Sequence, residues 1–139
     1  MRDPLASLIT RKARNPLEPM YEHIDAFEYV ATSPHANRSF IFPIDTPEFK
    51  NDRAARLRQG LALFEYCGLG SCGHAVEWSE ANTPQNTIGE YPEKAAYRAG
   101  DIAGATKGCF GEFMYLKSKE SVLRPFLEGL GYENLIWWD

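Results

Sequence analysis

Alternating apolar and polar positions run through several parts of this chain and predict β-strands. The clearest example begins at Tyr21, where Phe27, Tyr29 and Ala31 fall on one side and their neighbours on the other. A second alternation precedes Lys117, and a proline at position 43 would confine the apolar run around it to a sheet edge or to a strand end. The predicted strands are residues 21–33, 40–44, 75–78, 109–117 and 132–138.

A different spacing at the start of the chain predicts a short helix. Asp3 is a suitable capping residue and Pro4 suits the first helical position. Leu5, Leu8 and Ile9 then recur three and four residues apart, which gives the helix one apolar edge. Two prolines, at positions 16 and 19, end the pattern and form a stiff connector.

Two further helices are expected. Thr46 and Pro47 repeat the capping pattern and open a long helix that runs to Cys67, with Gly68 in the left-handed position that follows it. Its basic residues are interpreted as a solvated face. Residues 121–130 have apolar positions at helical spacing between two predicted strands, so the C-terminal third reads as strand, helix, strand.

These elements predict an α+β fold. We expect a small sheet of about four to five strands, packed by the long central helix and by the C-terminal strand-helix-strand unit. The predicted boundaries are residues 1–19 for the N-terminal helix and proline-rich connector, and residues 20–139 for a single α+β domain. Residues 79–108 carry few signals for regular structure and are a candidate binding segment because of their length.

Charge and composition narrow the classes of partner. The 139 residues carry a net charge of −4, of which residues 1–19 contribute +2 and the remainder −6. An acidic body does not suit a nucleic acid backbone, and no apolar run is long enough to span a bilayer. Three cysteines, an odd number, and the lack of a signal-peptide pattern predict an intracellular, reducing compartment, the cytoplasm by default.

The densest group of reactive side chains follows the long helix. Cys67, Cys72 and His74 lie within eight residues, and distant Cys109 would complete a zinc ligand set of three cysteines and one histidine. The spacing from Cys67 to Cys72 is wide for a zinc knuckle, and Cys109 stands alone. In an extended segment Cys72 and His74 would be about 7 Å apart, too far for a nucleophile and its base. We therefore interpret the group as packing, and expect no cofactor.

The sequence as a whole favours a non-enzymatic protein-protein interaction module. It would be an accessory subunit of a larger assembly, or a small inhibitor or adaptor of bacterial or phage type, and self-association is compatible with this. The alternatives are a thiol- or zinc-dependent enzyme centred on Cys67, Cys72 and His74, and a small-ligand sensor with an aromatic-lined pocket. The predicted interface consists of Leu5, Leu8, Ile9, Arg11, Trp137 and Trp138.

Overall fold

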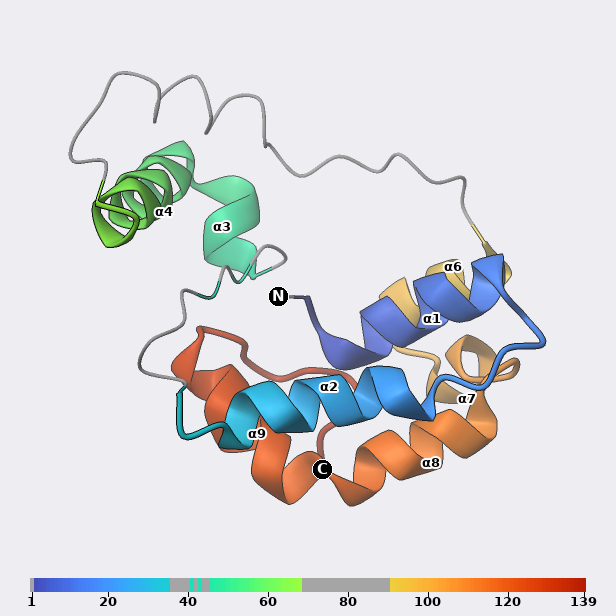
Figure 1. Ribbon diagram of the computed structural model, residues 1–139. Coiled ribbons are helices and arrows are strands. Elements are labelled where there is room, and N and C mark those ends of the chain that lie inside the picture. Colours follow the sequence, from blue (N-terminus) through green and yellow to red (C-terminus); the bar gives the residue numbers. More distant parts are fainter. Residues whose placement is uncertain (1, 36–40, 42, 44–45, 69–90) are drawn as a thin grey trace. The chain divides into compact units, whose positions relative to one another are not determined.

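The computed structural model describes residues 2–35, 41, 43, 46–68 and 91–139, and within these ranges the chain is helical. No strand occurs in the described ranges, so the prediction of an α+β fold with a four- to five-stranded sheet is wrong. The chain divides into two compact units. The first contains Met1 and Asn37–Thr87, and the second contains Arg2–Ala36 and Ile88–Asp139 (Figure 1).

The first unit contains helices α3 (Pro47–Asn51) and α4 (Arg53–Tyr66). As predicted, Thr46 caps the start, with its hydroxyl accepting from the Phe49 N–H, and Gly68 adopts a positive φ of 76° after the end. The single long helix that we expected is broken at Asp52, which is extended (φ −114°, ψ 104°). The Asp52 N–H still closes α3, while its carboxylate caps α4, so one residue serves both helix ends.

In the described part of the second unit, six helices come from two separate stretches of sequence. They are α1 (Pro4–Arg14), α2 (Tyr21–Thr32), α6 (Pro92–Arg98), α7 (Ile102–Ala105), α8 (Phe110–Ser118) and α9 (Glu120–Gly129). Helix α1 packs against α2, α6 and α8, and α2 packs against both α8 and α9. The predicted boundary between residues 19 and 20 falls inside this unit, between α1 and α2 (Figure 1).

The start of α1 is joined to the last residues of the chain by a buried carboxylate. Asp3 caps α1, as its sequence position predicts, by accepting from the Leu5 N–H at 3.0 Å. The same carboxylate accepts a hydrogen bond from the Trp137 indole N–H at 2.8 Å and another from the Tyr97 hydroxyl in α6. Asp3 is 2% exposed and Trp137 is 1% exposed. Helix α1 is thus an integral part of the core of this unit.

The segment predicted as the first strand, residues 21–33, is helix α2. Met20 and Ile24 are buried, and Phe27 and Ala31 are partly buried, which gives a stripe with spacings of four, three and four. In the sequence, Phe27, Tyr29 and Ala31 alternate with their neighbours, and this period of two led to the prediction of a strand. The packing of α2 against α1, α8 and α9 selects the helical period instead.

The other predicted strand in the C-terminal third, residues 109–117, is helix α8. Cys109, Phe113 and Leu116 are buried at spacings of four and three, again a helical stripe. The predicted terminal strand, residues 132–138, is irregular, because Asn134 has a φ of 51° that an extended strand does not allow. Of the predicted strand-helix-strand unit only the helix is present, as α9. The predicted strands at 40–44 and 75–78 lie largely or wholly outside the described residues.

Candidate interaction surface

The residues predicted for thiol or metal chemistry are only partly described. Cys67 is an exposed free thiol after α4 in the first unit, and Cys109 is a buried free thiol between α7 and α8 in the second. Cys72 and His74 lie outside the described residues. Within the described ranges, no three His, Cys, Asp or Glu side chains are grouped so that they could hold a metal ion.

Cys109 lies beside a shielded ion pair between α1 and α8. The Lys12 ammonium is 2.8 Å from the Glu112 carboxylate, and both side chains are mostly buried. Burial, followed by the charge of Glu112, raises the pKa of the Cys109 thiol to about 11, against a smaller opposing effect of Lys12. The thiol is therefore protonated at neutral pH, which makes it a poor nucleophile. Cys109 also lines a cavity of about 40 Å³ with Lys12 and Glu93. This volume suits water and is far below that of a typical ligand pocket.

A histidine and a serine are in contact between α1 and α2, but the contact lacks the polarity of a catalytic pair. The Ser7 hydroxyl lies 2.9 Å from Nε2 of His23, and the Arg11 guanidinium lies 3.4 Å from Nδ1. Because a guanidinium only donates, Nδ1 is the acceptor and the ring proton resides on Nε2, where it is donated to Ser7. Burial, and then the charge of Arg11, lowers the pKa of His23. This contact joins two helices and does not activate Ser7 as a nucleophile.

The residues predicted as an interface have different positions in the second unit. Leu5, Leu8 and Ile9 are buried in its core, so in this conformation they are not available to a partner. Trp137 is likewise buried, whereas Arg11 is exposed at its contact with His23. Trp138 is partly exposed, with its ring lying edge-on to Trp137 and the Arg124 guanidinium 5.1 Å from its centre.

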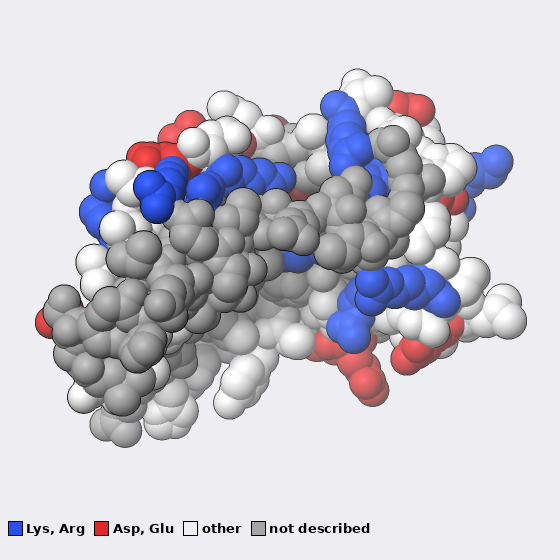
Figure 2. Space-filling model, turned by 90° about the horizontal axis from the view of Figure 1, so that it is seen from above, with Lys and Arg blue, Asp and Glu red and all other residues white. Residues whose placement is uncertain are grey.

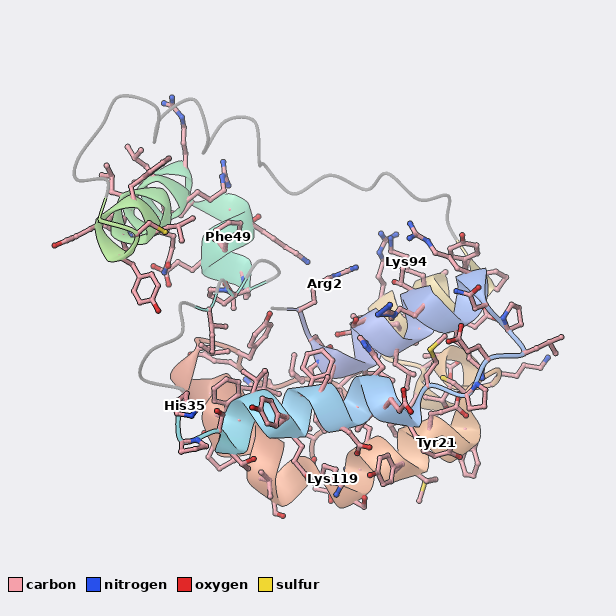
Figure 3. All side chains as sticks on the ribbon, in the orientation of Figure 1. Arg2, Tyr21, His35, Phe49, Lys94 and Lys119 are labelled. Carbon is pink, nitrogen blue, oxygen red and sulfur yellow. The ribbon has the colours of Figure 1, made fainter. Side chains whose placement is uncertain are left out.

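A set of large apolar side chains remains exposed where α2 meets the start of α8. Phe110 is 64% exposed and Met114 is 51% exposed, one helical turn apart on α8. Tyr21, the first residue of α2, is 42% exposed and points toward α8 (Figure 3). A Cβ added to Gly111 would lie 2.9 Å from the Tyr21 hydroxyl oxygen, which places Tyr21 next to the two α8 residues. We call Tyr21, Phe110 and Met114 the α2–α8 apolar face.

The α2–α8 apolar face is held in place by polar contacts between the two helices. The Tyr115 hydroxyl donates to the Asp25 carboxylate, and the Tyr115 ring lies edge-on to that of Tyr21 at 5.3 Å. One turn further on, the Lys119 ammonium pairs with Glu28 at 2.9 Å, on the same side of the unit (Figure 3). The hydrogen bond to Asp25, which is the largest effect, raises the pKa of Tyr115, and the bond to Glu28 raises the pKa of Lys119. Both groups therefore keep their protons at neutral pH.

Charged side chains are distributed differently elsewhere on the surface. On the face seen in Figure 2, the Lys and Arg side chains of the described residues are interspersed with Asp and Glu. On the α2 side of the α2–α8 apolar face, residues 15–29 contain four carboxylates and no lysine or arginine, and one of these carboxylates, Glu28, is paired with Lys119. Within the described residues, no helix combines the length and the apolar composition that crossing a bilayer requires.

Sequence reasoning missed the α2–α8 apolar face because it assigned both segments to strands. On a strand Phe110 and Met114 would also share a side, but Phe113 and Leu116 would then fall on opposite sides. Only the helical period separates Phe110 and Met114 from the buried stripe of α8.

Comparison with protein families, with curated proteins and with solved structures found no match.

Proposed function

We propose that this protein is a non-enzymatic protein-protein interaction module, an accessory subunit or adaptor that binds its partner through the α2–α8 apolar face. The observation that carries the proposal is the exposure of Phe110, Met114 and Tyr21 side by side. Aromatic residues and methionine are enriched at protein interfaces, where they supply the binding energy of the buried centre. Methionine is unbranched and flexible, so it can adapt to a partner's surface.

The remaining polar groups of the second unit support the same proposal. Asp3 is committed to capping and to the Trp137 indole, and Lys12 is committed to Glu112. The thiol of Cys109 is protonated, and the cavity beside it is too small for a substrate or a sensed metabolite. An enzyme centred on Cys72 and His74 would instead lose its activity in a Cys72→Ala variant.

The test is affinity capture from the cells that produce the protein, with captured proteins quantified by mass spectrometry. The full chain is compared with a Phe110→Ser/Met114→Ser variant and with a Val122→Ser control, which removes an exposed apolar side chain from α9. We expect the double variant to retain its helical circular dichroism and to lose the partner by about tenfold or more. The Val122 control should keep the partner. Equal capture by all three proteins would refute the proposal.

A further inference from the structure

We infer that the partner presents a cationic amphipathic helix to the α2–α8 apolar face. This inference rests on the proposed function and specifies the chemistry of the partner. It combines three observations: the exposed apolar side chains, the carboxylates beside them, and the all-helical architecture around them.

The connector before α2 carries one carboxylate, that of Glu18, and its backbone is tied to α1. The Lys12 ammonium donates a hydrogen bond to the Glu18 carbonyl oxygen at 2.8 Å, and it also forms an ion pair with Glu112 of α8. This double contact holds the connector against α8 on the side of Glu112. Leu17, in the same connector, is 96% exposed.

The carboxylates of Glu18 and Glu22 are available to a partner. Both residues are exposed, and neither carboxylate forms an ion pair within the described residues. Asp25 adds a third carboxylate, which accepts a hydrogen bond from the Tyr115 hydroxyl. An apolar centre with a rim of one sign selects a partner whose apolar centre has a rim of the opposite sign.

The same charges argue against a second copy of this chain as the occupant. A two-fold dimer brings the same patch of both copies together, so each acidic rim would approach its equivalent. A β-strand is also a poor occupant, because no strand edge is present within residues 91–139 or 2–35 to pair with its backbone. A helix satisfies its own backbone hydrogen bonds, and its apolar stripe can cover exposed side chains on two adjacent helices.

The experiment uses the full chain and two labelled peptides of about 18 residues, each with leucines at helical spacing. One peptide carries lysine at every polar position, and the other carries glutamate. Binding is measured by fluorescence anisotropy. The variants are Phe110→Ser/Met114→Ser, the charge reversal Glu18→Lys/Glu22→Lys, and the control Glu133→Lys. Glu133 is an exposed carboxylate in the turn after α9.

We expect the lysine peptide to bind at least about tenfold more tightly than the glutamate peptide. Charge reversal at Glu18 and Glu22 should weaken the lysine peptide about tenfold, and Glu133→Lys should change it less than about twofold. The serine variant should also weaken it about tenfold, because the apolar contact is lost.

Three results would overturn the inference: neither peptide binds, both bind equally, or the Glu18→Lys/Glu22→Lys variant binds the lysine peptide normally. Concentration-dependent self-association that Phe110→Ser/Met114→Ser abolishes would also overturn it, in favour of a second copy. In each of these cases the proposed function stands if the serine variant still loses its captured partner. It falls only if that capture is unchanged.

Discussion

Replacement of Asp3 by alanine tests the link between the beginning and the end of the second unit. The change removes the cap of α1, which costs about 1 kcal/mol. It also leaves the buried Trp137 indole N–H without its acceptor, which costs about 1–3 kcal/mol. The Tyr97 hydroxyl is only partly buried and can turn to water, so it adds little. We expect Asp3→Ala to lower the free energy of unfolding by about 3 kcal/mol.

The assay is urea unfolding followed by circular dichroism, with Asp101→Ala as the matched control. Asp101 also caps a helix of this unit, accepting from the Gly104 N–H at 3.0 Å, but it is exposed. The control should therefore lose about 1 kcal/mol. A Trp137→Phe background removes the indole donor, so there Asp3→Ala should cost about 1–2 kcal/mol less. Equal losses for Asp3→Ala and Asp101→Ala would refute the reasoning.

Three further predictions concern the buried groups of the second unit. Because the pKa of His23 is lowered on folding, the free energy of unfolding should fall as the pH drops below the ordinary value of 6.5. Urea unfolding across this range should show a smaller fall for His23→Gln, and an equal fall would contradict the assignment. At about pH 8, iodoacetamide should alkylate Cys67 well before Cys109, which peptide mapping would detect, whereas equal rates would rule out the buried thiol. Lys12→Met should lower the free energy of unfolding by about 3 kcal/mol, because it leaves Glu112 unpaired. Adding Glu112→Met should restore much of that loss in the same urea assay, and no recovery would contradict the pairing.

The parts of the fold that sequence reasoning predicted correctly depend on local chemistry. Asp3 followed by Pro4, and Thr46 followed by Pro47, cap helices through groups two or three residues away, so both helix starts could be read directly. Gly68 was equally readable, because a left-handed residue at a helix end is a local requirement.

The errors came from segments whose period depends on distant packing. In α2 the aromatic residues suit either period, and only burial of Ile24 against other helices decides between them. The hydrogen bond between Asp3 and Trp137 joins positions 134 residues apart, so no local pattern announces it. The α2–α8 apolar face was hidden for the same reason, since its exposure follows only from α8 being a helix.

The discontinuous composition of the second unit has a consequence for how the protein is made. Helix α1 is synthesised well before Tyr97 and Trp137, which complete the burial of its Asp3 cap. Residues 2–36 must therefore wait for residues 88–139 before this core can close. Until residues 88–139 have been synthesised, Leu5 and Leu8 lack much of their final cover, and a nascent chain stalled before α8 would expose them to chaperones.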